Sequence, residues 1–223
     1  MLSFDHNERL DEARARNIRD ALAEDIGVAD WTGRLAPAGE RVRARVIVRE
    51  TAVLCGCDWF AGCLLALDPQ ASIRWHSIEG ADLPADSEVC HIEANARALL
   101  AAERPALNFL QLLSGTATIT RQFARAIEGA SPRPRGCAVL DTRKTVPGLR
   151  LAQKYAVRVG GGANQRLALY DGILIKENHI AAAGGVAAAL VNAQALQAGV
   201  EIQIEVETLD QLREALAAGA TSV

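Results

Sequence analysis

Three short apolar runs in the second half of the chain end abruptly in charged residues. The runs with the polar residues that follow them are Ala138–Leu140 before Asp141–Lys144, Ile173–Ile175 before Lys176 and Glu177, and Ile202–Ile204 before Glu205. This pattern is typical of buried parallel strands whose carboxyl ends open into a polar pocket. Because parallel strands end at the same edge of a sheet, we expect these charged side chains to form one site.

Amphipathic stretches at 147–159, 185–198 and 209–218 predict helices that alternate with the three strands. Thr208 and Gln211 predict a capping box at the start of the last helix, and Gly219 a glycine just past its end. Such βαβ units imply a parallel sheet. Thr221–Val223 reads as the entry to a fourth strand. Three βα units and the start of a fourth cannot close a barrel, which needs about eight such units. The sequence therefore predicts either an open α/β sheet or the front part of a longer chain.

The first half of the chain has no such rhythm, and it predicts an α+β domain. Expected helices are 12–25 and 59–67, and expected strands are an alternating one at 41–49 and others within 73–78 and 89–100. Pro105 is expected to open a long helix that is interrupted at Ser114-Gly115 and resumes to Gly129, before a proline-rich loop at 130–136. The predicted domains are 1–113 and 114–223.

The charge balance limits the possible partners. The chain has 24 Lys and Arg against 27 Asp and Glu, a net charge of -3, whereas a nucleic-acid-binding domain is usually basic. A strongly anionic ligand must therefore be held by a local cluster of cations. No nucleic-acid partner is expected.

Five scattered cysteines fit neither a zinc pair nor a disulfide framework, so we expect reduced, mostly buried thiols. The N-terminus does not read as a signal peptide, and no apolar run approaches the roughly 20 residues of a membrane span. We expect a cytoplasmic protein with no membrane partner.

Several long strings occur in the order typical of one enzyme family. They are Glu103–Phe109 with Ser114-Gly115, Leu140–Arg150, Lys154–Val157, Gly160–Leu167, Leu174–His179 and Glu205–Glu207. Through these strings the sequence resembles quinolinate phosphoribosyltransferases, the pentosyltransferases also called carboxylating nicotinate-nucleotide pyrophosphorylases. The resemblance runs from the first predicted helix to the last residue.

The resemblance implies an α+β N-terminal domain followed by an incomplete, C-terminally truncated α/β barrel. It also implies a homodimer with a shared active site, or a higher oligomer. The expected reaction joins quinolinate to phosphoribosyl pyrophosphate with Mg²⁺ and gives nicotinate mononucleotide, carbon dioxide and pyrophosphate, a step of NAD biosynthesis.

Site residues are carried over by position. Residues matching Arg143, Arg166 and Lys176 hold the quinolinate carboxylates, Thr142 lines the same pocket, and Arg104 matches a residue that reaches the partner subunit's site. Lys144 matches a residue near the ribosyl donor, and Glu205 matches an acid near the ribose and metal, so the resemblance makes these two the expected catalytic residues. The metal ligands stay open.

Two features depart from the family pattern. Gln165 stands where the family usually has His, so it can hydrogen-bond but cannot carry charge. The second departure is at the end of the sequence: in the family, the strand that begins at Thr221–Val223 leads to a metal-associated Asp, and later glycine-rich loops hold the 5′-phosphate, and none of these is present in this sequence. We expect Gln165 to contact substrate in place of the imidazole.

Two alternatives stay open. One is a related phosphoribosyltransferase with another acceptor, although the set of Arg104, Arg143, Arg166 and Lys176 favours a dicarboxylate. The other is a catalytically silent fragment that binds anions or dimerises with intact subunits.

Overall fold

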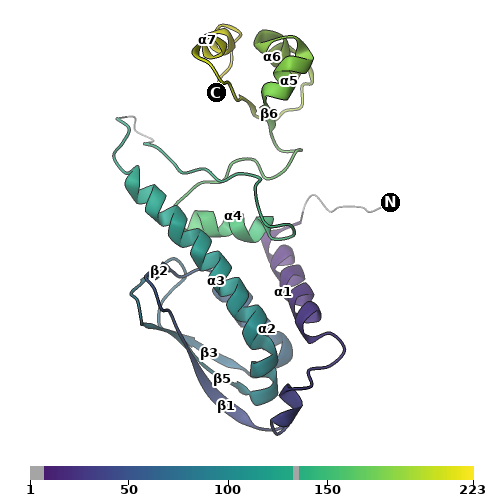
Figure 1. Cartoon of the computed structure of the whole chain (residues 1–223), viewed down its shortest axis with the longest axis vertical. Helices are drawn as coiled ribbons and strands as arrows, with labels where there is room; N and C mark the ends of the chain where they lie inside the picture. Colours follow the sequence, from purple (N-terminus) through teal and green to yellow (C-terminus); the bar gives the residue numbers. More distant parts are fainter. Residues whose placement is uncertain (1–7, 133–135) are drawn as a thin grey trace. The chain divides into compact units, whose positions relative to one another are not determined.

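A computed structural model describes residues 8–132 and 136–223 of the chain. The polypeptide forms two compact units, one through Asn164 and the other from Gln165 onward, each of which is described separately below (Figure 1). Both units mix helices and strands, as the sequence predicts. The domain boundary predicted at 113/114 falls inside a continuous helix and stays a prediction.

The described residues of the first unit form a three-stranded sheet, a two-stranded sheet and four α-helices. Its elements are α1 (Leu10–Ile26), a 3₁₀ turn (Gly33–Leu35), β1 (Arg41–Ile47), β2 (Ala52–Val53), α2 (Cys57–Leu67), β3 (Ser72–Trp75), β4 (Asp82–Leu83), β5 (Glu88–Asn95), α3 (Ala96–Ala126) and α4 (Arg150–Val159). The larger sheet is antiparallel with the order β1-β5-β3, and α2 packs along α3 (Figure 1).

Alternation along β1 and β5 gives the larger sheet one apolar and one polar face. Val46 and Ile92 point into the core, together with residues of α2 and α3 such as Phe60 and Leu110. Arg43 pairs in register with Glu93, and these two side chains form an ion pair on the exposed face. The alternating strand expected at 41–49 is thereby confirmed, and acidic residues of β5 neutralise part of the charge of its exposed arginines.

Helix α3 begins at Ala96, and the predicted start at Pro105 was wrong. Asn95 is the N-cap, and its side-chain oxygen accepts hydrogen bonds from the backbone N–H groups of Arg97 and Ala98 at 3.0 and 3.3 Å. A proline inside a helix removes one hydrogen bond and costs about 3 kcal/mol or more. Pro105 itself is buried in the core face of α3, and this burial offsets the cost.

The predicted interruption of the helix at Ser114-Gly115 was also wrong. The polar residues of this stretch remain helical, and their side chains form hydrogen bonds with the backbone at residues 53–55. The Ser114 hydroxyl accepts a hydrogen bond from the Cys55 N–H and donates one to the Cys55 carbonyl, both at 3.0 Å. The Thr118 hydroxyl accepts one from the Val53 N–H at 2.8 Å. The helix thus runs unbroken to Ala126. Residues 133–135 of the predicted loop lie outside the described residues.

The buried strand predicted at Ala138–Leu140 is absent from the described residues. Leu140 forms only an isolated parallel bridge with Ala163, and its side chain is exposed. Two backbone hydrogen bonds accompany the bridge, from the Ala163 N–H to the Val139 carbonyl at 2.8 Å and from the Asp141 N–H to the Ala163 carbonyl at 3.2 Å. A single bridge does not sustain a strand, so the segment stays irregular.

The second unit confirms the predicted parallel strands. Its elements are β6 (Ile173–Ile175), α5 (Glu177–Ala183), α6 (Val186–Ala195), β7 (Ile202–Ile204) and α7 (Leu209–Ala217). Strands β6 and β7 pair in parallel, with Ile175 opposite Ile204. Helix α5 was not predicted, and its seven residues are too few for a clear apolar periodicity. The two strands and helices α6 and α7 enclose a small apolar core.

Helix α7 has the predicted N-cap. Thr208 accepts a hydrogen bond from the Gln211 N–H at 3.1 Å, whereas the Gln211 side chain accepts from the Glu207 N–H rather than from the N-cap residue. Gly219 follows the helix with φ 86°, as the predicted terminal glycine requires. Beyond it, the Ser222 carbonyl accepts a hydrogen bond from the Ile204 N–H at 3.1 Å, so the last residues run beside β7.

All five cysteines are free thiols, as predicted. Cys55, Cys63 and Cys90 are buried, Cys57 is half-buried, and Cys137 is exposed. Burial raises the pKa of Cys63 and of Cys90 to about 12 and raises that of Cys55 and Cys57 further. None of the described helices combines the length and the apolar character of a transmembrane span.

Candidate active site

The carboxyl ends of β6 and β7 bring two of the predicted site residues together. Lys176 follows β6 and Glu205 follows β7, and the Glu205 N–H donates to the Ile175 carbonyl at 2.9 Å. The Lys176 Nζ lies 3.2 Å from a Glu205 carboxylate oxygen. The prediction that these strands present charge at the same end is therefore confirmed.

This ion pair is accessible to solvent. The Lys176 and Glu205 side chains are 42% and 56% exposed. An exposed pair of this kind contributes at most about 1 kcal/mol to stability. The pair can therefore break at little cost, which allows Lys176 to bind a negative group of a ligand and Glu205 to bind a positive one.

His179 supports the position of Lys176. Its Nδ1 accepts a hydrogen bond from the Lys176 N–H at 3.0 Å, at the start of α5. This is a local contact at a helix terminus, and it gives His179 a role in holding the backbone of Lys176. His179 is therefore not included in the site.

Gln165 and Arg166 also contact the β6–β7 region of the second unit. The Gln165 side-chain N–H donates to the Gln203 side-chain oxygen on β7 at 3.1 Å. The Arg166 Nη1 donates to the Gly172 carbonyl, just before β6, at 3.2 Å. A guanidinium has five N–H donors, so a single bond within the described part of the chain leaves Arg166 with the capacity to bind a carboxylate.

The segment Thr142–Lys144 belongs to the first unit and is irregular. The Thr142 hydroxyl accepts a hydrogen bond from the Lys144 N–H at 3.0 Å, and the side chains of both residues are exposed. Arg143 is half-buried, and its Nε is shielded from solvent with no hydrogen-bond partner in the described part of the chain. A buried donor without an acceptor costs about 1–3 kcal/mol, and a bound carboxylate would supply the missing acceptor.

Three residues hold the Thr142–Lys144 segment in place, and none of them was assigned a role from the sequence. Lys154 on α4 forms an ion pair with Asp141 at 2.5 Å, and the two side chains are only 5% and 6% exposed. Asn164 donates to the other Asp141 carboxylate oxygen at 2.5 Å and to the Lys154 carbonyl at 2.9 Å. We call Asp141, Lys154 and Asn164 the anchor cluster. A lysine among the buried positions of α4 is the signal that could have revealed it.

Arg104 lies on the exposed side of α3. It borders a depression of about 370 Å³ that is also lined by Asn17, Asp20, Glu24 and the backbone turn at Pro147–Leu149. Within residues 8–132 and 136–223, no side chain or carbonyl forms a hydrogen bond or ion pair with its guanidinium. Arg104 is therefore available to a ligand or to another subunit.

Asp141 and Glu205 differ in whether their carboxylates are available to bind a magnesium ion. Mg²⁺ prefers oxygen ligands and usually binds one or two carboxylates together with substrate phosphates. The anchor cluster uses both oxygens of Asp141, whereas the Glu205 carboxylate is accessible and weakly paired. Glu205 is thus chemically suited to a magnesium ion that arrives with a diphosphate.

Comparisons with known proteins identify relatives along nearly the whole chain. Residues 30–114 match the family model described as "Quinolinate phosphoribosyl transferase, N-terminal domain", and residues 116–223 match the model of the C-terminal domain. A probable nicotinate-nucleotide pyrophosphorylase [carboxylating] of Bacillus subtilis is 40% identical over 198 residues, which are 88% of this chain and 67% of the relative. A nicotinate-nucleotide pyrophosphorylase [carboxylating] of Mycobacterium leprae is 40% identical over 92% of this chain and 72% of the relative.

The fold is similar to solved structures of the same kind of protein. The structure of the nicotinate-nucleotide pyrophosphorylase from Francisella tularensis matches with a TM-score of 0.87 and 41% sequence identity, and the match covers 98% of this chain and 76% of that one. A NadC crystal structure from Streptococcus pyogenes matches with a TM-score of 0.84 and 37% identity, over 92% and 72% of the two chains. This chain therefore spans about two thirds to three quarters of the length of these relatives.

Proposed function

The chain belongs to the quinolinate phosphoribosyltransferase family, and on this premise we propose that it transfers a phosphoribosyl group to quinolinate with decarboxylation. The products are nicotinate mononucleotide, carbon dioxide and pyrophosphate. The observation that carries the proposal is the ion pair of Lys176 and Glu205 at the carboxyl ends of two paired parallel strands. The positive group of Lys176 suits a carboxylate of quinolinate, and the negative group of Glu205 suits the ribose on which positive charge develops.

Quinolinate is a dianion and needs fixed positive charge. Arg143 offers a buried N–H that has no acceptor among the described residues, Arg166 offers a guanidinium with spare donors, and Lys176 offers an accessible ammonium. Arginine suits bidentate binding of a planar carboxylate, and lysine supplies a point charge. We assign the two carboxylates of quinolinate to these three residues, with Thr142 beside them.

The ribosyl donor carries several negative charges. Lys144 is exposed, and it is assigned to the phosphates of the donor. Magnesium, when bound with the donor, neutralises diphosphate charge, and Glu205 is the residue assigned to hold it. These assignments agree with the accessible position of both side chains.

The reaction forms one C–N bond and breaks a C–O and a C–C bond. The quinolinate ring nitrogen attacks ribose C1, and the bond from C1 to the pyrophosphate oxygen breaks. Positive charge that develops on the ribose is stabilised by the Glu205 carboxylate, and binding of both substrates in line is a positioning effect. The C2 carboxylate then leaves as carbon dioxide, the pyridinium stabilises the carbanion, and a proton from solvent completes the product.

Gln165 is assigned a hydrogen-bonding role. Its side chain already donates to Gln203, and it remains neutral at every pH at which the protein is folded. Substitution Gln165→His should introduce a pH dependence of quinolinate binding that the natural chain lacks. The KM for quinolinate measured across the pH range in both chains tests this assignment.

A homodimer is proposed from Arg104. Its guanidinium has no partner among the residues that the structure describes, yet it lies on a helix of the first unit that is otherwise well packed. A role in the site of a second subunit explains why this exposed cation is present in the Glu103–Phe109 string.

The proposed function is tested with the purified chain, quinolinate, phosphoribosyl pyrophosphate and MgCl₂. Nicotinate mononucleotide, pyrophosphate and carbon dioxide should form in equal amounts. Nicotinate, which lacks the second carboxylate, is the matched control acceptor and should give no product. Product from nicotinate and none from quinolinate would favour a phosphoribosyltransferase with another acceptor, and no product from either would contradict the proposal.

A further inference from the structure

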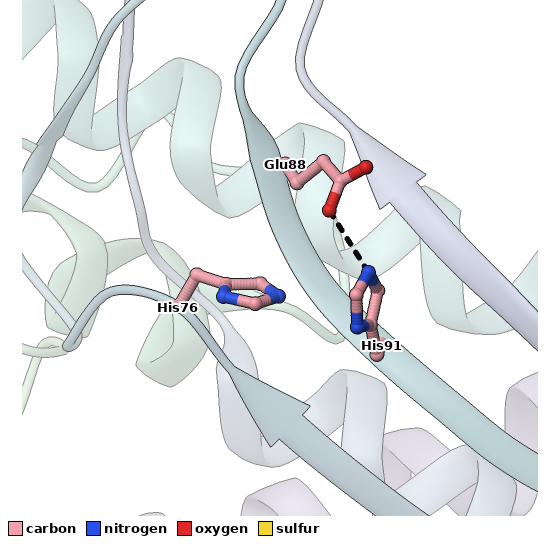
Figure 2. Close-up of side chains that lie close together, drawn as sticks. All are labelled: His76, Glu88 and His91. Carbon is pink, nitrogen blue, oxygen red and sulfur yellow. Dashed lines mark hydrogen bonds and ion pairs between the residues drawn. The ribbon is translucent and has the colours of Figure 1, made fainter.

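Three potential metal ligands converge on the exposed face of the larger sheet in the first unit. His76 follows β3, and Glu88 and His91 lie on β5 (Figure 2). One ligand atom of each residue lies within 4.8 Å of the other two. The cluster contains none of the residues assigned to phosphoribosyl transfer.

A β-bulge explains why Glu88 and His91 share a face. Residues three apart in a regular strand point to opposite faces. The register between β1 and β5 shifts, since Val46 pairs with Cys90 and Ile47 pairs with Glu88, which leaves Val89 as the extra residue. A bulge of this kind redirects side chains and is common beside functional sites.

The pairing of β3 with β5 brings in His76. Trp75 is opposite Cys90, and the His76 N–H donates to the Val89 carbonyl at 3.0 Å. The rings of His76 and His91 meet edge to face with their centroids 4.7 Å apart. His91 Nε2 lies 2.8 Å from a Glu88 carboxylate oxygen, and Figure 2 shows both His76 and Glu88 directed toward the His91 ring.

We propose that His76, Glu88 and His91 bind a divalent transition-metal ion of the zinc class. Two imidazole nitrogens and one carboxylate oxygen form a donor set that Zn²⁺ binds in proteins, with water in the fourth position. Imidazole does not suit Mg²⁺, which prefers oxygen. The site is therefore distinct in chemistry from the magnesium that accompanies the ribosyl donor.

Arg45 supports this role from outside the ligand set. It lies on β1 opposite His91 and donates to the Glu88 Oε1 at 2.6 Å, so it leaves the Oε2 for the metal. Partners of this kind fix the orientation of a ligand and contribute about 10–100-fold to metal affinity. The ion would link β5 to β3, which is an edge strand of the sheet.

Arg74 opposes the same role, which makes the proposal sharply testable. Its Nη2 donates a hydrogen bond to the His91 Nδ1 at 3.1 Å, so Nδ1 carries no hydrogen and Nε2 carries the hydrogen directed at Glu88. A metal ion on Nε2 displaces that hydrogen, and the ring then carries its proton on Nδ1, facing a second donor. Arg74 is exposed and must turn away, so its removal should strengthen binding.

The test is calorimetric titration of the full chain, without an affinity tag and after treatment with a chelator, with ZnCl₂. We expect one ion per chain, and we expect His76→Ala and His91→Ala each to weaken binding by at least about tenfold. Arg74→Gln should tighten binding severalfold. The matched control Glu93→Gln, which changes a carboxylate on the same strand and face, should leave the affinity unchanged.

A second measurement uses the unaltered chain and does not depend on the folding of variants. Diethyl pyrocarbonate modifies accessible histidines, and Zn²⁺ should protect His76 and His91 while it leaves His179 reactive. Equal modification of all three residues with and without Zn²⁺ would overturn the proposal. Binding that is unchanged in both His76→Ala and His91→Ala would overturn it as well.

Discussion

Substitution Lys154→Met removes the cation from an ion pair that is almost fully shielded from water. The Lys154 Nζ lies 2.5 Å from the Asp141 carboxylate, and the two side chains are 5% and 6% exposed. Methionine has a similar length and keeps the packing of α4. Asp141 would retain the hydrogen bond from Asn164 but would lose the ammonium group of Lys154.

Removal of one partner from a buried ion pair typically costs about 3–5 kcal/mol. Because a hydrogen bond to a charged group is worth about 1.5–3 kcal/mol and the bond from Asn164 remains, we expect a loss near the lower end, about 3 kcal/mol. The double variant Asp141→Asn with Lys154→Met should recover much of this loss, since no unbalanced charge is then buried.

Urea unfolding followed by tryptophan fluorescence measures this loss. Trp59 is a suitable reporter because it is buried and its ring lies 5.5 Å from that of Tyr155, the residue after Lys154. The control Arg213→Met breaks an ion pair with Asp210 in which the side chains are 73% and 91% exposed, and it should change stability by no more than about 0.5 kcal/mol. Equal losses in Lys154→Met and Arg213→Met would refute the reasoning.

Three further predictions address the site and the response to acid. Arg143→Ala should lower kcat/KM for quinolinate by about 30-fold or more, equivalent to at least about 2 kcal/mol, while the KM for the ribosyl donor stays constant in the same assay. Inactive Arg104→Ala and Lys144→Ala chains, when mixed, should regenerate activity if Arg104 acts in the partner's site; no recovery after demonstrated subunit exchange would contradict this. Hydrogen bonds, first of all that from the Asn95 N–H, lower the pKa of Asp68 below its ordinary value. Since a lowered folded-state pKa gives stability that is present above the ordinary value and lost as the pH falls through the lowered one, Asp68→Asn should flatten acid unfolding below about pH 4.

Local patterns predicted the strands and two of the three described helices of the second unit, whereas α5 was missed. Apolar triplets followed by Lys176 and Glu205 predicted parallel strands with charge at one end, and the paired strands confirm this. Thr208 and Gly219 predicted the ends of the last helix, because caps depend on the identity of one or two residues. Such features are local in sequence and need no knowledge of distant contacts.

Elements that depend on distant partners were not predictable in the same way. Pro105 favours the first turn of a helix, yet it lies inside α3, where it is buried against parts of the chain that are distant in sequence. The run at Ala138–Leu140 is apolar enough for a strand, but in the described residues only Ala163 pairs with it. The anchor cluster joins residues 141, 154 and 164, and only the folded chain brings them together.

The contrast among the five thiols makes Cys137 a natural handle for chemical labelling. Alkylating reagents react with the thiolate, and burial that raises the pKa of Cys55, Cys57, Cys63 and Cys90 suppresses that form while it also blocks access. Cys137 is exposed and lies shortly before the segment that carries Arg143. A fluorophore attached through a maleimide should therefore report on quinolinate binding without any engineered cysteine.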